Sequence, residues 1–154
     1  MATDTLNAFQ NWQQYLQQAD FEYLIQYIEN IKNGIPNHEM IILLGPGCNG
    51  KSTLIEEIQT HLGDQLFEFH DVRELIYEEN IKPLIFIHQG LLDRTNRNYR
   101  GIKNLPNAVI NFINYGVSFI IETNHLDTIN TRILEHSRII EMTHIFTPNA
   151  QYIH

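Results

Sequence analysis

The chain has little cysteine and no long apolar run, and each shortage excludes a class of protein. Its single cysteine, Cys48, cannot form an internal disulfide or a cysteine-based zinc site. No apolar run approaches the roughly 20 residues that cross a bilayer. The opening MATDTLNAFQ has no basic stretch followed by an apolar one, so it does not resemble a secretion signal. We therefore expect neither a membrane protein nor a secreted one.

Basic residues are also scarce, with 10 Lys and Arg against 18 Asp and Glu and a net charge of −8. A net negative charge argues against nucleic-acid binding over the whole surface. The basic residues are nevertheless concentrated, because four of the ten lie between positions 94 and 103. The sequence therefore predicts a local basic patch on an acidic protein.

At 154 residues the chain allows one domain, and its 43 % apolar residues are enough to bury a core. Apolar residues at three- and four-residue spacing predict helices over 5–33, with a second start at Asp20, and over about 51–62. Short apolar runs predict strands at 40–44, 66–70, 84–87, 117–122 and 138–146. This alternation predicts a three-layer α/β domain with a mainly parallel five-stranded sheet. We divide the chain into an N-terminal helical segment (1–37), a core (38–147) and a tail (148–154).

A glycine-rich loop directly follows the first predicted strand and leads into a predicted helix. It fits the pattern G-x-x-x-x-G-K-[ST] and reads Gly45-Pro46-Gly47-Cys48-Asn49-Gly50-Lys51-Ser52-Thr53. Glycines let successive N–H groups turn toward phosphate oxygens, and the positive end of the helix faces the same phosphates. Lys51 would contact the β- and γ-phosphates, and the Ser52 hydroxyl would bind Mg²⁺. The motif predicts a nucleoside triphosphate site, in which we interpret Cys48 as a filler residue rather than a nucleophile.

The loop sequence GPGCNGKSTL resembles the Walker A motif of the superfamily 3 helicases of DNA viruses, within the AAA+ ATPases. The sequence Phe-Ile-Ile-Glu-Thr-Asn at 119–124 resembles their motif C, and LDTINTRILEHSRIIEMTHIF at 126–146 resembles their closing helix, arginine and strand. The resemblance covers about residues 38–147. It implies an AAA+-like P-loop ATPase core that uses ATP and Mg²⁺ and forms a homo-oligomeric ring, with a hexamer as one candidate. It also implies action in viral or mobile-element DNA replication or remodelling, in the cytoplasm or nucleus of a host cell.

The same resemblance implies roles for residues outside the loop. Asn124 takes the sensor-1 position, where its amide would hydrogen-bond the γ-phosphate or the attacking water. Arg132 or Arg138 would be the arginine finger that reaches the nucleotide of the next subunit. The residues themselves also allow purely structural roles. Asn124 could form a turn at the end of a strand, and each arginine could form a surface ion pair.

The pattern breaks at the strand that should carry the Walker B acids. Residues 84–87 are followed by His88 and Gln89, with no carboxylate. Gln89, in the catalytic position, has the shape of Glu but cannot accept a proton, and His88 suits Mg²⁺ poorly because that ion prefers oxygen. Three interpretations stay open: hydrolysis is slow or absent, another acid serves the site, or Gln89 is an introduced Glu-to-Gln change that traps ATP. The candidates for another acid are Glu122, Asp71 and Asp93.

The basic segment lies between the strand at 84–87 and the strand at 117–122. Its candidate contact residues are Arg94, Arg97, Tyr99, Arg100 and Lys103. In the resembled helicases this segment lines the central pore of the ring, which implies DNA phosphate contacts and base stacking by the tyrosine. The same arginines could instead contact an acidic neighbouring subunit or a nucleotide, or be solvated.

Two other functions compete with the ATPase motor. A small P-loop kinase fits the size of the chain, and His70-Asp71 followed by Arg73 faintly resembles an acceptor site. A non-hydrolysing nucleotide-binding switch or assembly subunit fits the missing acids. Phosphate transfer to a nucleoside would identify the kinase, and ATP-dependent oligomerisation without turnover would identify the switch.

Overall fold

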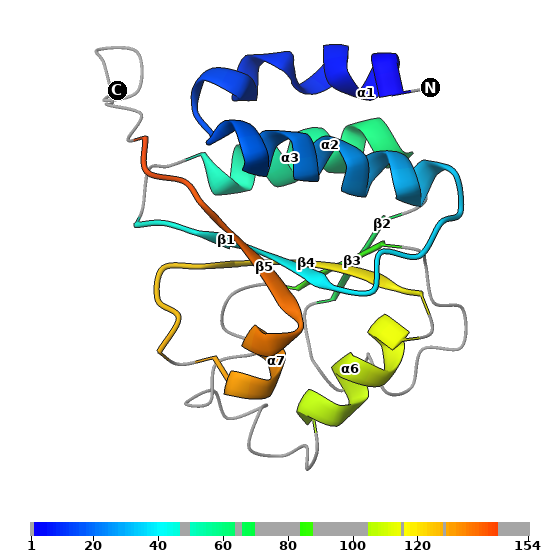
Figure 1. The fold of residues 1–154 in the computed structure, drawn as a ribbon, viewed down its shortest axis with the longest axis vertical. Coiled ribbons are helices and arrows are strands. Elements are labelled where there is room, and N and C mark those ends of the chain that lie inside the picture. Colours follow the sequence, from blue (N-terminus) through cyan, green and yellow to red (C-terminus); the bar gives the residue numbers. More distant parts are fainter. Residues whose placement is uncertain are drawn as a thin grey trace.

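The strands form one parallel sheet through the centre of the molecule (Figure 1). The computed structural model describes residues 2–46, 50–63, 66–69, 84–87, 105–114, 116–127 and 129–144. The strands are β1 (Met40–Leu44), β2 (Leu66–Phe69), β3 (Leu84–Ile87), β4 (Ser118–Thr123) and β5 (Ser137–Glu141). The helices are α1 (Ala2–Phe9), the 3-10 helix η1 (Gln10–Gln14), α2 (Gln18–Lys32), α3 (Lys51–Leu62), α6 (Leu105–Asn114) and α7 (Thr131–Glu135).

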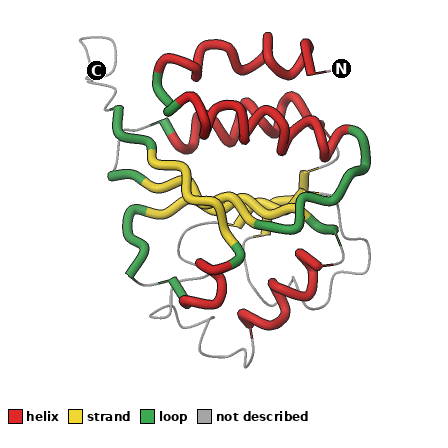
Figure 2. The backbone as a smooth tube through the Cα atoms, in the orientation of Figure 1, coloured by secondary structure: helices red, strands yellow, loops and turns green. Residues whose placement is uncertain are grey.

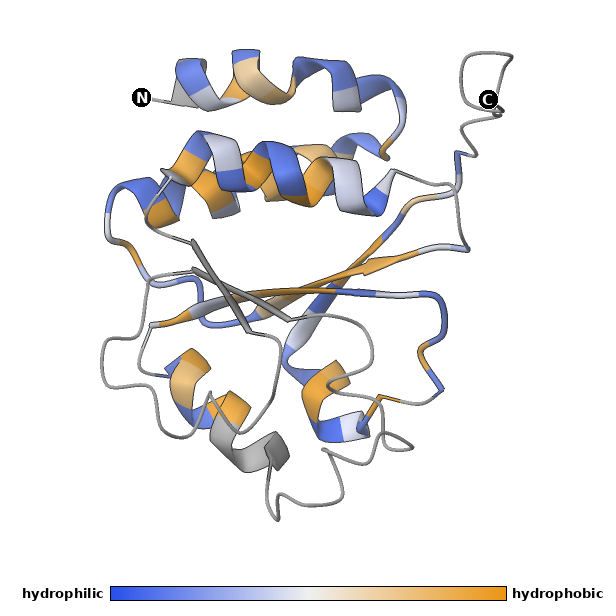
Figure 3. Cartoon of the chain, turned by 180° about the vertical axis from the view of Figure 1, so that it is seen from behind, coloured by the Kyte–Doolittle hydropathy of each residue, from blue (hydrophilic) through white to orange (hydrophobic). Residues whose placement is uncertain are grey.

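The sheet has the order β2-β3-β4-β1-β5, and each described strand pair is parallel. Parallel strands covered on both faces are apolar along their whole length, as the buried run Met40–Leu43 shows. Apolar residues are concentrated in β1 and β4 (Figure 3). Strand β4 pairs with β1 on one side and with β3 on the other. Residues that follow β4 are therefore placed between the ends of its two neighbours.

Helices cover both faces of the sheet, with α2 and α3 on one side and α6 and α7 on the other (Figure 2). On the α2–α3 side, Ile41 and Leu43 of β1 join a core cluster with Ile120 of β4 and Leu54 of α3. On the opposite side a second cluster contains Met40, Ile42, Val109, Ile113, Phe119, Ile121, Ile129 and Ile133. The prediction of an α/β domain with a parallel sheet is confirmed.

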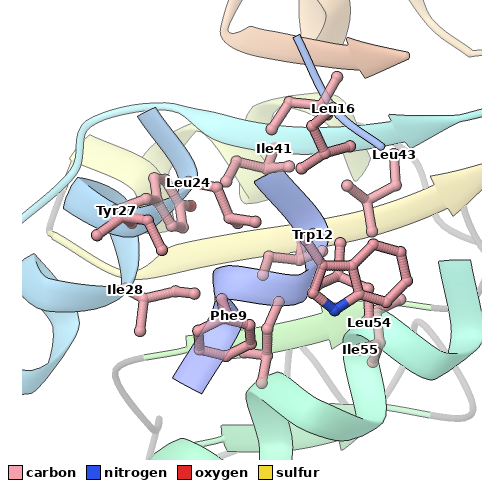
Figure 4. Close-up of a cluster of buried hydrophobic side chains, with 14 of the residues drawn as sticks. Phe9, Trp12, Leu16, Leu24, Tyr27, Ile28, Ile41, Leu43, Leu54 and Ile55 are labelled. Atoms are coloured by element: carbon pink, nitrogen blue, oxygen red, sulfur yellow. The ribbon is translucent and has the colours of Figure 1, made fainter. Parts of the chain in front are cut away.

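The helices α1 and η1 form a further layer, laid over α2 and α3 (Figure 1). Phe9, Trp12 and Leu16 are buried there, against residues of α2 and α3 such as Ile28 and Leu54 (Figure 4). The sequence periodicity indicated these helices but not their position. They pack into the same core cluster as the helix that begins at Lys51.

Several element boundaries differ from the predictions by one residue or more. The second N-terminal helix begins at Gln18 rather than Asp20, after Gln17 in extended conformation. The last strand, predicted over 138–146, is Ser137–Glu141. The Met142 N–H still donates to the Leu44 carbonyl oxygen at 2.7 Å, and the ring of His144 then packs against Tyr15 of the N-terminal layer. None of the helices in the described residues is long and apolar enough to cross a membrane.

Candidate functional site

The glycine-rich loop leaves the carboxyl end of β1 and returns at the start of α3. Gly45 is buried, and its N–H donates to the carbonyl oxygen of Thr123 at 3.2 Å, which joins the loop to β4. Gly50 has φ of +82°, a left-handed conformation that glycine adopts without steric cost, and α3 begins at the next residue. The three residues between Pro46 and Gly50 lie outside the described residues.

The ammonium of Lys51 contacts the backbone at the start of the loop. Lys51 is 8 % exposed, and its Nζ donates to the carbonyl oxygens of Gly45 at 2.6 Å and Pro46 at 3.0 Å. A buried ammonium is stable only with such partners. Ser52 and Thr53 are exposed in the first turn of α3, where the helix presents N–H groups without intrahelical partners. The Lys51 ammonium and the positive N-terminal end of α3 thus lie close together, which suits the binding of a polyphosphate.

Asn124 is exposed immediately after β4. Thr123 is opposite Leu44 in the ladder, so Asn124 follows a strand that ends beside the start of the loop. The Thr123 side chain closes a turn here, since its Oγ1 donates to the carbonyl oxygen of His125 at 2.8 Å and accepts from its N–H at 3.1 Å. Because β4 lies between β1 and β3, Asn124 occupies the position between the loop and the end of β3.

The two arginine-finger candidates differ in their surroundings. Arg138 is on β5 opposite Ile41, and its guanidinium forms an ion pair with Asp20 of α2, with 3.0 Å between Nη2 and Oδ1. Arg132 is exposed near the start of α7, and its backbone N–H is capped by the side chain of Asn130. The structure therefore places Arg138 in a contact within its own chain and leaves Arg132 on the surface.

Several predicted residues lie outside the described residues. These are Gly47, Cys48, Asn49, His88, Gln89, Asp71, Asp93 and the basic segment residues Arg94, Arg97, Tyr99, Arg100 and Lys103. Of the three alternative acids, Glu122 is described; it is half-buried on β4, opposite Leu43 of β1. Within the described ranges no group of three or more His, Cys, Asp or Glu side chains could hold a metal ion.

A polar junction between α1, α2 and α3 was not predicted from the sequence. Thr5 Oγ1 donates to Glu29 Oε2 at 2.6 Å, and Lys32 Nζ lies 3.3 Å from both Thr5 Oγ1 and His61 Nε2. The Thr5 hydroxyl holds the pKa of Glu29 below its usual range, while burial and then the Lys32 charge lower the pKa of His61. These contacts join residues up to 56 positions apart, so no local pattern could reveal them.

A groove of about 510 Å³ lies beside this junction, along the surface of α3. Ala8 of α1 lines it together with Thr53, Glu56, Glu57, Thr60 and His61 of α3. Glu57 also accepts a hydrogen bond from the indole N–H of Trp12. The groove is therefore acidic, and it shares Thr53 with the glycine-rich motif.

No family model matches the chain, and no curated protein matches it. Among solved structures, the fold is similar to that of C. elegans PCH-2, an AAA+ ATPase, with a TM-score of 0.56 and 10 % identity over 91 % of this chain. The chain spans about half of that structure's length, 47 %. At this identity the likeness shows the fold alone, a parallel sheet with helices on both faces.

Proposed function

We propose that the chain is an ATP-binding P-loop ATPase of the AAA+ type. The observation that carries the proposal is the buried Lys51 ammonium, held on the carbonyls of Gly45 and Pro46 where β1 ends and α3 begins. Those carbonyl contacts satisfy the cation until phosphate oxygens replace them. The left-handed Gly50 and the N–H groups of the first turn of α3, which have no intrahelical partner, complete a cradle for phosphates.

The remaining roles follow from positions around the loop. Residues 45–53 hold the triphosphate, and the exposed Ser52 hydroxyl is the ligand that the chain offers to Mg²⁺. The ion, when bound, neutralises charge on the phosphates. Asn124, at the end of the strand between β1 and β3, holds the γ-phosphate or the water that attacks it.

The proposal extends to a homo-oligomeric ring, of which a hexamer is one candidate. Arg132 and Arg138 are both candidates for the arginine finger: Arg132 is exposed near the start of α7, and Arg138 forms an ion pair with Asp20. The basic residues between 94 and 103 supply a DNA contact in this proposal. The superfamily 3 helicase branch and a role in viral replication rest on the sequence resemblance alone, and the fold similarity supports the AAA+ core.

Titration with a fluorescent ATP analogue in the presence of Mg²⁺ tests the nucleotide site. Lys51→Ala should weaken binding by about 10- to 100-fold, which corresponds to the loss of a charged hydrogen bond of about 1.5–3 kcal/mol. Lys32→Ala removes the same charge at the N-terminal junction and should leave the affinity unchanged. Equal binding by wild type and Lys51→Ala would contradict the proposal.

Phosphate release with and without single-stranded DNA then separates the competing functions. Turnover that is absent in Lys51→Ala and stimulated by DNA favours the motor. ATP binding with ATP-dependent assembly but no turnover favours the switch. Transfer of the phosphate to a nucleoside favours the kinase.

A further inference from the structure

Hydrolysis at the proposed site needs a group that orients and deprotonates the attacking water, and the sequence supplies no carboxylate at the usual place. The strand β3 is followed by His88 and Gln89, neither of which is an acid. A water molecule attacking a phosphorus atom must be oriented and must lose a proton, and a carboxylate is a suitable acceptor. The role of such a carboxylate rests on the proposed function, because it concerns the same ATP site.

Glu122 is an acidic residue near the strand that leads into the glycine-rich loop. It belongs to β4, between β1 and β3, and is opposite Leu43, two residues before Gly45. The next residue, Thr123, accepts the hydrogen bond from the Gly45 N–H, so Glu122 is one residue from the contact that joins β4 to the loop. The residue after that is Asn124.

Strand alternation fixes the face of the sheet on which Glu122 lies. Ile120, two residues earlier, belongs to the core cluster that contains Leu54 of α3, and Leu43 belongs to the same cluster. Because alternate residues of a strand share a face, Glu122 lies on the face that α3 covers. This is the helix whose first residue is Lys51.

Among the described residues, none accounts for a carboxylate at this position. The residues that share its face nearby, Leu43, Ile120 and Ile140, are apolar and buried. In the part of the chain that the structure describes, the half-buried Glu122 side chain has no ion-pair or hydrogen-bond partner. A carboxylate placed beside apolar residues without a partner loses hydration and gains nothing in exchange. Its position is better explained by a ligand.

We propose that Glu122 is the catalytic carboxylate of the ATP site, in place of an acid at the end of β3. The water oxygen forms a bond to the γ-phosphorus while the Glu122 carboxylate accepts one of the water protons. The bond between the γ-phosphorus and the bridging oxygen breaks, and the electron pair stays with ADP. The proton then leaves Glu122 with the phosphate or to solvent, which restores the carboxylate. Asn124 orients the water from the end of the same strand.

A matched pair of Glu-to-Gln variants tests this assignment. Glu122→Gln keeps the shape of the side chain but cannot accept the proton. Glu141→Gln makes the same change on β5, the other neighbour of β1, at an exposed residue opposite Leu44. Three quantities are measured for each: phosphate release, affinity for the ATP analogue, and the nucleotide that remains bound after incubation with Mg-ATP, identified by chromatography.

For Glu122→Gln we expect turnover to fall at least 100-fold, since a general base contributes about 10²–10⁴-fold. The affinity for ATP should stay within about threefold, because binding depends on the loop, and the bound nucleotide should be ATP rather than ADP. Glu141→Gln should resemble wild type. If Glu122→Gln fails to fold, Glu122→Asp provides the test, with lower turnover and unchanged affinity expected.

The possible results separate this inference from the proposed function. Wild-type turnover in Glu122→Gln overturns the role of Glu122 and leaves the ATPase intact. ATP binding by wild type without any turnover also overturns it, and leaves a nucleotide-binding switch. Failure of the wild-type chain to bind ATP removes both.

Discussion

Arg138 of β5 and Asp20 of α2 form an ion pair across 118 residues of sequence. Nε and Nη2 of the arginine donate to the same oxygen, Asp20 Oδ1, at 3.3 and 3.0 Å. The guanidinium also lies 4.9 Å from the ring centroid of Tyr23, one turn further along α2. The pair therefore fixes the second N-terminal helix to the edge strand of the sheet.

The first prediction concerns this pair. Arg138→Ala should lower the free energy of unfolding by about 1–3 kcal/mol, because the Asp20 side chain is 12 % exposed and would lose its ion-pair partner. Asp20→Asn in the same chain should recover part of that loss. Urea unfolding of the single and double variants measures the coupling, and Glu135→Ala, at an exposed charged residue of α7, serves as a control that should leave stability nearly unchanged. Full stability of Arg138→Ala with a loss of ATP turnover would instead assign the finger role to Arg138.

Arg138 also shows a feature that the sequence alone could not predict, namely the long-range partner of a charged residue. A conspicuous arginine before a final strand suggested a finger, but its partner Asp20 lies in the helical segment assigned to a different part of the chain. The glycine-rich loop, by contrast, is a continuous stretch of sequence, and the spacing of its glycines, Lys51 and Ser52 predicts phosphate binding. Likewise, the buried run at 40–44 identifies a strand, whereas the position of β4 between β1 and β3 depends on long-range pairing.

The second prediction concerns the hydroxyl of Tyr27, which is buried between α2 and the sheet. It accepts the Phe119 N–H at 3.0 Å and lies 2.9 and 3.0 Å from the carbonyl oxygens of Glu39 and Phe119. Burial raises the pKa of Tyr27, so the hydroxyl remains a donor at neutral pH. Tyr27→Phe should cost about 1–3 kcal/mol of unfolding free energy, because it leaves a buried N–H without a partner.

Tyr23→Phe is the matched control for Tyr27→Phe. Tyr23 is half-buried and donates to the Glu39 carboxylate, which water can solvate after the change. The expected loss is under about 1 kcal/mol. Equal losses of unfolding free energy in the two variants would show that the contacts of Tyr27 with Phe119 add no more stability than the Tyr23 hydrogen bond does. Thermal and urea unfolding monitored by circular dichroism give both values.

The third prediction is a pH dependence that arises at the junction of Thr5, Glu29, Lys32 and His61. Burial and the Lys32 ammonium lower the pKa of His61, so the folded state binds its proton less readily than the unfolded state, where the value is about 6.5. The unfolding free energy should therefore fall as the pH falls from about 7 through about 6. Protonation would also place a positive ring beside Lys32 Nζ, which is 3.3 Å from Nε2.

Glu29 at the same junction gives the unfolding free energy a second pH dependence, at lower pH. The pKa of Glu29 is lowered, chiefly by its hydrogen bond from Thr5, so its contribution is present above the unfolded value of about 4.3 and is lost as the pH falls through the folded value. Urea unfolding between pH 7.5 and 5.5 isolates the histidine. His61→Gln should flatten the slope in that range, whereas His125→Gln, an exposed histidine, should keep it. A slope unchanged by His61→Gln would rule out this histidine as its source.

The fourth prediction assigns a step to Asn124. Asn124→Ala should lower ATP turnover by about 100-fold, the cost of removing one positioned donor from a reacting oxyanion. The affinity for the ATP analogue should change less than threefold, because in the proposed site Lys51 and the loop hold the phosphates without it. Asn114→Ala, an exposed asparagine at the end of α6, controls for the substitution itself. Phosphate release and analogue titration on the same samples separate the two effects. A parallel loss of affinity and turnover would place Asn124 in ground-state binding instead, because an interaction made equally before and during the reaction changes the affinity for ATP rather than the rate of its hydrolysis.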